Sequence, residues 1–173
     1  MKILVLNYEF PPVGGGGGRA CWHTCRELAR MGHDLLVGTT CFRGAPREET
    51  REGVRIRRIP ALRGKIESCN SAELLSYALS SSWWAWRQCS RERPDLVHVY
   101  FGVPSGPGAL VLKKLRGVPY VVSLRGSDVP RSEVRKFRHI YPLMKPFLRS
   151  LWRNAGAVVS VSEGLRDEAL RTC

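Results

Sequence analysis

Short apolar runs alternate with helix-length segments along almost the whole chain, and this alternation constrains the fold more than any other feature of the sequence. The runs cover residues 2–7, 35–37, 54–59, 96–100, 120–124 and 157–161. Short unbroken apolar runs are typical of parallel strands buried on both faces, whereas the partly alternating run at 54–59 is expected nearer a sheet edge. Strands that alternate with helices predict an α/β fold, a doubly wound, Rossmann-like parallel sheet in a single domain spanning 1–173.

Helix signals fill the longer segments between the runs. Cys21 and Cys25 recur at helical spacing ahead of a glycine that suits a helix C-cap. Ser71 offers an N-cap for a long helix that ends before Pro94. Apolar residues at helical spacing form a stripe along this long helix: Leu74, Leu75, Ala78, Leu79, Trp83 and Trp86.

Positive charge dominates the composition, since 28 Lys and Arg against 15 Asp and Glu give a formal net charge of +13 at pH 7. An anionic partner is therefore expected, either phosphate, an acidic lipid headgroup or a nucleic acid; a solvated basic surface is the alternative. The segment 131–153 interleaves basic and aromatic residues. It fits contact with an anionic membrane or a phosphorylated acceptor, or else a basic helix whose aromatic residues lie in the core.

The six cysteines form no Cys-x-x-Cys pair and have no histidine at metal-ligand spacing, so no metal site is predicted. Cys21 and Cys25 would share one helix face as buried thiols. This usage favours a reducing, cytoplasmic setting. No apolar run approaches membrane-spanning length, which leaves at most peripheral contact with a membrane.

Five successive glycines, 14–18, follow the first predicted strand and lead directly into a helix. Glycines allow backbone N–H groups to approach an anion closely, and a helix N-terminus adds partial positive charge, so this loop predicts phosphate binding. A plain mobile connector is the alternative. NAD is disfavoured because no acidic residue follows the second strand to hold a ribose, although Arg43 leaves an NADP-binding oxidoreductase open.

Polar side chains also follow the later strands, at the edge where ligands of such sheets bind. Arg125, Ser127 and Asp128 come after the strand at 120–124. Arg125 can bind phosphate or a hydroxylated substrate through its planar fork, and Asp128 can orient it, or the two can form a pair that only fixes the loop.

Two further positions carry candidate side chains. His98 lies within an apolar strand and either faces the cleft or is a satisfied core residue. Ser162 and Glu163 open the last helix, where Ser162 suits an N-cap and contact with an acceptor is the second role considered.

Taken in order, these segments resemble the N-terminal domain of retaining glycosyltransferase family 4, also called group 1. The resemblance covers nearly the whole chain and rests on five motifs. They are Tyr8-Glu9-Phe10-Pro11-Pro12 followed by glycines, Arg-Glu-Leu-Ala-Arg-Met-Gly-His-Asp at 26–34, Pro-Asp-Leu-Val-His-Val-Tyr at 94–100, Leu-Arg-Gly-Ser-Asp at 124–128 and Val-Ser-Glu-Gly-Leu at 161–165.

The resemblance implies one of the two Rossmann-like domains of a GT-B fold, and transfer of a sugar from a nucleotide-sugar donor with retention of configuration. It implies that Gly15, Gly16 and Gly17 approach the donor diphosphate, and that this domain mainly holds the acceptor, which can be lipid-linked or a polysaccharide. Arg125 stands where many members have a histidine; because arginine cannot act as a general base, an electrostatic or positional contribution is expected from it. The predicted site is completed by a catalytic pair, Arg125 and Asp128, and by the acceptor contacts Tyr8, His98, Ser127, Ser162 and Glu163.

A second domain with basic residues and two glutamates eight positions apart is expected for this family, and no two acids of the chain have that spacing. We therefore expect the donor-binding C-terminal domain to lie outside these 173 residues, and the chain alone to be inactive. Two other hypotheses remain: the NADP-binding oxidoreductase domain, and a non-enzymatic basic module for anionic membrane or RNA. No recognised nucleic-acid motif appears in the sequence, so RNA ranks last.

Overall fold

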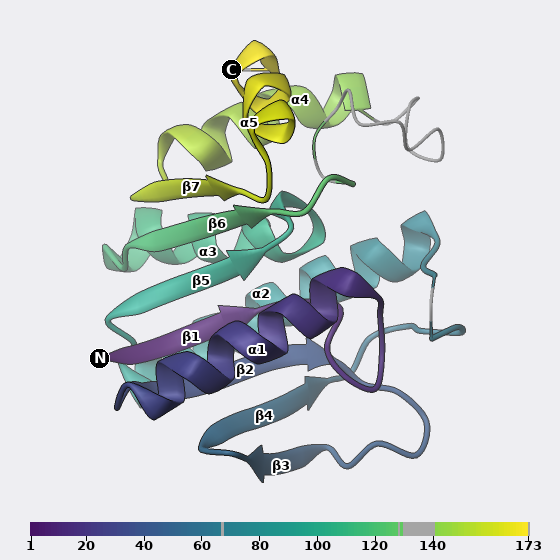
Figure 1. Cartoon of the computed structure of the whole chain (residues 1–173), viewed down its shortest axis with the longest axis vertical. Helices are drawn as coiled ribbons and strands as arrows, with labels where there is room; N and C mark the ends of the chain where they lie inside the picture. Colours follow the sequence, from purple (N-terminus) through teal and green to yellow (C-terminus); the bar gives the residue numbers. More distant parts are fainter. Residues whose placement is uncertain (67, 128, 130–140, 173) are drawn as a thin grey trace.

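A computed structural model describes residues 1–66, 68–127, 129 and 141–172. Seven strands form one sheet, in the order β3-β4-β2-β1-β5-β6-β7, with helices on both faces (Figure 1). The strands are β1 (Lys2–Leu6), β2 (Asp34–Thr40), β3 (Glu48–Arg51), β4 (Val54–Ile59), β5 (Leu96–Tyr100), β6 (Tyr120–Leu124) and β7 (Ala157–Ser160). The helices are α1 (Gly16–Arg30), α2 (Ser71–Glu92), α3 (Gly102–Arg116), α4 (Tyr141–Arg153) and α5 (Glu163–Thr172).

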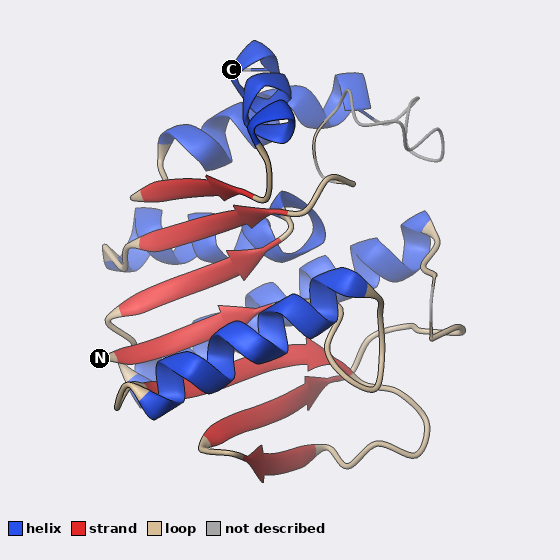
Figure 2. Cartoon of the chain, viewed as in Figure 1, coloured by secondary structure: helices blue, strands red, loops and turns tan. Residues whose placement is uncertain are grey.

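The predicted doubly wound parallel sheet is confirmed. Strands β4, β2, β1, β5, β6 and β7 pair in parallel, and their arrowheads point the same way in Figure 2. Sequence analysis missed β3, which pairs antiparallel with β4 through a turn at Glu52 and Gly53. One edge strand is therefore β3, which is short and largely charged, a common way of blunting a sheet edge, and β4 lies one position further in. The other edge strand is β7, where Val158 and Val159 are 40% and 52% exposed, so the apolar run at 157–161 is not buried on both faces.

The sheet changes winding direction between β1 and β5. From β1 the chain runs outward to β2 and β4, and then returns through α2 to β5, which pairs with the other side of β1. In open α/β sheets the crevice at such a switch point, beyond the carboxyl ends of the strands, is where ligands bind. The loops after β1 and β5 are therefore the first place to look for a site.

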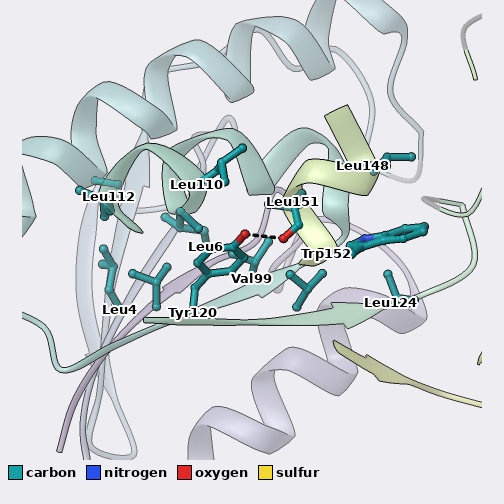
Figure 3. Packing of buried hydrophobic residues seen from close by; sticks show 14 of the residues in the cluster. Leu4, Leu6, Val99, Leu110, Leu112, Tyr120, Leu124, Leu148, Leu151 and Trp152 are labelled. Atoms are coloured by element: carbon teal, nitrogen blue, oxygen red, sulfur yellow. Dashed lines mark hydrogen bonds between the residues drawn. The ribbon is translucent and has the colours of Figure 1, made fainter. Parts of the chain in front are cut away.

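Two hydrophobic layers hold the helices on the sheet. On one face, α1 packs Cys21, Trp22 and Cys25 on β1, β2 and β4. Helices α2, α3 and α4 contribute to the core on the other face, with α2 and α3 behind the sheet in Figure 1. Figure 3 shows this second core, where the Tyr120 hydroxyl donates a hydrogen bond to the carbonyl oxygen of Leu151. The prediction that Cys21 and Cys25 are buried on one helix face is confirmed.

Helix α2 spans Ser71–Glu92 as predicted, but its N-cap is Asn70 and not Ser71. The Asn70 side chain accepts from the Glu73 backbone N–H at 2.9 Å, and the Glu73 carboxylate accepts from the Asn70 backbone N–H at 2.8 Å. This reciprocal pair is a capping box, which satisfies two backbone donors that a helix start leaves open.

The buried stripe of α2 also differs from the apolar stripe in the sequence. Its buried residues are Tyr77, Ser81, Ala85 and Cys89. Leu75, Leu79 and Trp83 are instead 60%, 66% and 64% exposed. Apart from Tyr77, the buried residues of α2 are small, and α2 lies close to α3: a Cβ on Gly108 of α3 would come 3.1 Å from the Ser82 Cα. Close approach of the two helix backbones favours small residues at this contact, so the apolar stripe of the sequence is not the stripe that packs.

Within the described residues, the helices are too short or too polar for any of them to cross a lipid bilayer.

Candidate functional site

The structure brings together the loop after β1, the start of α1 and the residue that follows β5. The ring of Tyr8 lies 5.0 Å from the ring of Phe101, centroid to centroid. Phe101 also lies beneath the glycine loop, since a Cβ on Gly17 would come 2.5 Å from its Cζ. The predicted glycine site and the switch point of the sheet are therefore one place.

The five glycines of this loop divide into packed and open positions. Gly14 has φ +95°, and a Cβ there would come 2.5 Å from the Glu9 Cβ. Gly17 is closed by Phe101, and Gly18 is buried against the Glu9 backbone. A Cβ on Gly15 or Gly16, in contrast, would meet no atom within 4 Å. Only these two of the predicted donor contacts are exposed, and they stand at the N-terminus of α1.

A carboxylate already interacts with this helix N-terminus. The Glu9 Oε2 accepts a hydrogen bond from the Gly15 backbone N–H at 3.2 Å. Gly15 is the N-cap of α1 and has no side chain to cap it, and the first turn of α1 holds no acidic residue. Glu9 therefore supplies the negative charge that the helix dipole favours, at the loop where the sequence predicts phosphate binding.

Tyr8 is half-buried and lies beside a residue that sequence analysis missed. The Arg63 guanidinium lies over the Tyr8 ring, 5.7 Å from its centroid. Arg63 also donates to the Ile66 carbonyl at 2.9 Å and to the Cys69 Sγ at 2.6 Å, and so fixes the irregular segment before α2. Burial, and then the Glu9 carboxylate, raise the pKa of Tyr8 well above its ordinary value, so this phenol is neutral at pH 7.

An open groove of about 640 Å³ lies beyond the ends of β2 and β4. Arg43, the residue that kept NADP binding among the alternatives, lines the groove together with Phe42 and Arg63. The sequence gives no periodic signal for Arg63, because it lies in a segment without helix or strand. Arg63 lines the groove and also contacts the Tyr8 ring. The groove therefore lies beside Tyr8 and extends the site away from the glycines.

His98 is held inside the sheet. Its Nε2 lies 2.8 Å from the Ser123 Oγ, and its ring lies 4.6 Å from the Tyr100 ring. Burial, and then the Arg125 guanidinium, lower the pKa of His98 to about 4. The imidazole is therefore neutral at pH 7 and forms a hydrogen bond with a neighbouring strand, as a satisfied core histidine does.

Arg125 is half-buried directly after β6, with its guanidinium 4.8 Å from the centroid of the Tyr100 ring. Tyr100 is fully buried. Arginine keeps its charge in every accessible pH range, so Arg125 places a fixed cation at the carboxyl edge of the sheet, one strand away from Phe101. Stacking on Tyr100 orients the plane of the guanidinium.

The other predicted site residues have simple placements. Ser127 is half-buried in the turn after β6, and Asp128 lies outside the described residues. The Ser162 Oγ accepts from the Leu165 backbone N–H at 3.2 Å, which confirms Ser162 as the N-cap of α5. Glu163 is exposed at the first position of this helix. Much of the segment 131–153 also lies outside the described residues, although Trp152 of α4 is in the core.

Across residues 1–66, 68–127, 129 and 141–172, no three His, Cys, Asp or Glu side chains gather in a way that could hold a metal ion. The donors at the site are backbone N–H groups and guanidinium groups. Such donors suit phosphate or hydroxyl groups of a ligand.

Comparison with known proteins agrees with this geometry. A family model described as "Glycosyl transferase 4-like domain" matches residues 15–172. The glycogen synthase of Mycobacterium tuberculosis is 29% identical over 147 residues, which cover 76% of this chain and 35% of that protein. The 2-deoxystreptamine N-acetyl-D-glucosaminyltransferase of Streptomyces fradiae is 33% identical over 144 residues, with 76% of this chain and 33% of that protein covered. The chain thus spans about a third of the length of these curated relatives.

Solved structures show the same fold. A sucrose-phosphate synthase from Thermosynechococcus elongatus superimposes with a TM-score of 0.80 at 15% identity, covering 99% of this chain and 45% of that one. MurG from Acinetobacter baumannii gives a TM-score of 0.51 at 17% identity, with 92% of this chain and 40% of that one covered. These similarities confirm the Rossmann-like fold, and with the family match over residues 15–172 they show that the chain belongs to the glycosyl transferase 4-like family, as an N-terminal domain of the group 1 type.

Proposed function

We propose that residues 1–173 form the acceptor-side domain of a glycosyltransferase that transfers a sugar from a nucleotide-sugar donor to an acceptor, with retention of configuration. The observation that carries the proposal is the pair of open glycines, Gly15 and Gly16, at the N-terminus of α1 in a domain of this family. Backbone N–H groups at a helix N-terminus suit the donor diphosphate. In this proposal the nucleotide sugar is a co-substrate, and no resident cofactor or metal is assigned to the domain.

Each end of the site has its own role in the proposal. Gly15 and Gly16 contact the donor phosphates, and the groove beside Tyr8 and Arg63 receives the acceptor. Three further acceptor contacts carried over from the sequence stay in the proposal: Ser127, Ser162 and Glu163. The burial of His98 and its contact with Ser123 support an indirect role, in which it supports the strand ends that position Arg125.

Arg125 is proposed to stabilise negative charge on the departing diphosphate or to orient a substrate hydroxyl. Its fixed charge and its stacking on Tyr100 support this role. It cannot remove a proton, so the acceptor hydroxyl has to lose its proton to another group or to the departing phosphate. Asp128 is proposed as the residue that orients Arg125 or a sugar hydroxyl.

Catalysis in this proposal needs a second domain outside residues 1–173, so the chain alone neither transfers sugar nor hydrolyses the donor. The length of the relatives, about three times the matched part, supports this. We place the protein in the cytoplasm, with peripheral contact at the inner face of the membrane. The acceptor class extends from lipid-linked sugars to polysaccharide ends.

The test is the stereochemistry of the product made by the parent protein that contains both domains. Proton NMR of the first product should show the anomeric configuration of the donor, and inversion would contradict the proposal. Arg125→Ala in that protein should lower kcat by about a hundredfold, the size expected when one charge-stabilising group is lost. Arg125→Lys should recover part of kcat if charge is what matters, whereas equal activity of Arg125→Ala and the wild type would remove Arg125 from the site.

A further inference from the structure

An apolar and basic surface on the outer side of α2 and α3 has no role in the site described above. Leu75, Leu79 and Trp83 follow one another every four residues along the outer stripe of α2 and are 60–66% exposed. On α3, Val111 and Leu115 are 41% and 67% exposed. The two helices pack side by side on the same face of the sheet, so the five side chains belong to one side of the molecule (Figure 1). Apolar residues grouped in this way on a surface mark an interaction site.

The charge on this side is of one sign. In α2 and α3, both described over their full length, every exposed residue is apolar, small, a serine or basic. The exposed cations are Arg87, Arg91, Lys114 and Arg116. The two helices contain only two acids, and both are engaged elsewhere: Glu73 in the capping box of α2, and Glu92 in an ion pair with Arg55 at 3.1 Å.

The apolar and basic parts follow each other along α2. Leu75, Leu79 and Trp83 occupy its first half, within about 80° around the helix axis, and Arg87 and Arg91 follow at the same four-residue spacing toward its C-terminal end, about 24 Å from Leu75 to Arg91 at the rise of an α-helix. The Arg116 guanidinium of α3 lies 4.3 Å from the centroid of the Trp86 ring and adds charge at the boundary between the helices. Large aliphatic side chains and a tryptophan beside arginine and lysine heads are the composition of surfaces that lie at a membrane interface.

We propose that the outer surface of α2 and α3 docks on an anionic lipid bilayer, with Leu75, Leu79 and Trp83 entering the interface and the four cations contacting lipid phosphates. The complementarity of charge selects the occupant: a surface without exposed carboxylates and with a protein net charge of +13 is attracted to acidic lipids. The docking surface leaves the carboxyl edge of the sheet, with its glycine loop, free for substrates.

The experiment is co-sedimentation of the 1–173 chain with phosphatidylcholine vesicles, with and without phosphatidylglycerol as the anionic lipid. Binding is expected only with phosphatidylglycerol present, and it should weaken as salt rises from about 0.05 M to about 0.5 M. Leu79→Ser/Trp83→Ser should bind about tenfold more weakly or worse. Both positions are exposed, so circular dichroism melting should show an unchanged fold. Met31→Ser removes an apolar side chain that is 72% exposed at the end of α1 and should bind as the wild type does.

Charge is tested by a second matched pair. Arg87→Gln/Arg91→Gln should weaken vesicle binding several-fold, while Arg166→Gln/Arg171→Gln, which removes the same charge from exposed positions of α5, should leave it unchanged. Equal losses from both pairs would show unspecific attraction and overturn the proposal. Absence of binding to anionic vesicles would overturn it as well. So would a Leu79→Ser/Trp83→Ser variant that still binds vesicles while losing a dimer seen by sedimentation velocity, because the surface would then join two copies of the chain.

Discussion

Adjacent glycines in the first turn of α1 should respond in opposite ways to the same substitution. Gly17→Ala places a Cβ 2.5 Å from the Phe101 Cζ, and Phe101 is only 5% exposed, so the ring cannot move aside without disturbing Tyr8. Overpacking of this kind costs about 1–3 kcal/mol. Gly16→Ala meets no atom within 4 Å and removes backbone freedom from the unfolded chain, which gives a gain between zero and about 1 kcal/mol.

These energies translate into melting temperatures. In a domain of this size 1 kcal/mol shifts Tm by about 2–4 °C, so Gly17→Ala should lower Tm by about 2–12 °C while Gly16→Ala leaves it unchanged or raises it slightly. Differential scanning calorimetry measures both. Calorimetric titration measures the affinity of each variant for pyrophosphate. Gly16→Ala should bind pyrophosphate more weakly despite its intact stability, because its methyl group occupies the space open to the phosphate. Equal Tm shifts for the two variants would refute the division of the loop into packed and open glycines.

Three further outcomes follow from the contacts of the site and the sheet. Glu9→Gln should raise the affinity for pyrophosphate severalfold in the same titration, since a charge that competes at the Gly15 N–H is removed; lower affinity would mean that Glu9 supports the ligand. Because the pKa of His98 falls from 6.5 to about 4 on folding, its stabilising contribution is complete above pH 6.5 and is lost as pH falls toward 4. Urea unfolding measures this as a change in the free energy of unfolding between pH 7 and pH 4. The free energy of unfolding of the wild type should fall by up to about 3 kcal/mol more than that of His98→Gln, and equal falls would contradict the shifted pKa. Glu49→Gln should destabilise the protein by about 2 kcal/mol, because it weakens the 2.6 Å ion pair of the buried Arg58; a loss below about 0.5 kcal/mol would show that the carbonyl partners of Arg58 suffice.

Most of the strands that sequence analysis predicted are buried, because runs such as 2–7 and 120–124 are apolar on successive residues, as is typical of a buried parallel strand. The apolar run at 157–161 is the exception, since β7 lies at an edge of the sheet and its residues Val158 and Val159 are 40% and 52% exposed. Strand β3 has no such signal, because Glu48 and Glu49 are charged and its strand structure comes from pairing with β4. In α2 the apolar pattern of the sequence predicts the wrong buried face. Its most apolar stripe is exposed, because close packing against α3 requires the smaller residues Ser81 and Ala85.

For the candidate site, the sequence predicts the loop that reaches the switch point of the sheet but not the arrangement of the residues within it. A run of glycines after a buried strand locates the loop, because parallel strands end at one edge of the sheet. Which glycines are open depends on Glu9 and Phe101, whose positions are set by tertiary contacts with Gly14 and Gly17. The contact of Arg63 with Tyr8 could not be predicted from the sequence, because Arg63 lies in an irregular segment that no periodic pattern marks.

The central claim is that this domain serves the transfer of a sugar from a nucleotide sugar and needs a second domain to do so. The most direct measurement is consumption of UDP-, GDP- and ADP-sugars by the parent protein, followed by release of the nucleoside diphosphate, with the 1–173 chain measured in parallel. We expect the parent to consume one of these donors and the 1–173 chain to consume none. Turnover by the short chain alone, or tight binding of a nicotinamide dinucleotide by a parent that ignores every nucleotide sugar, would contradict it.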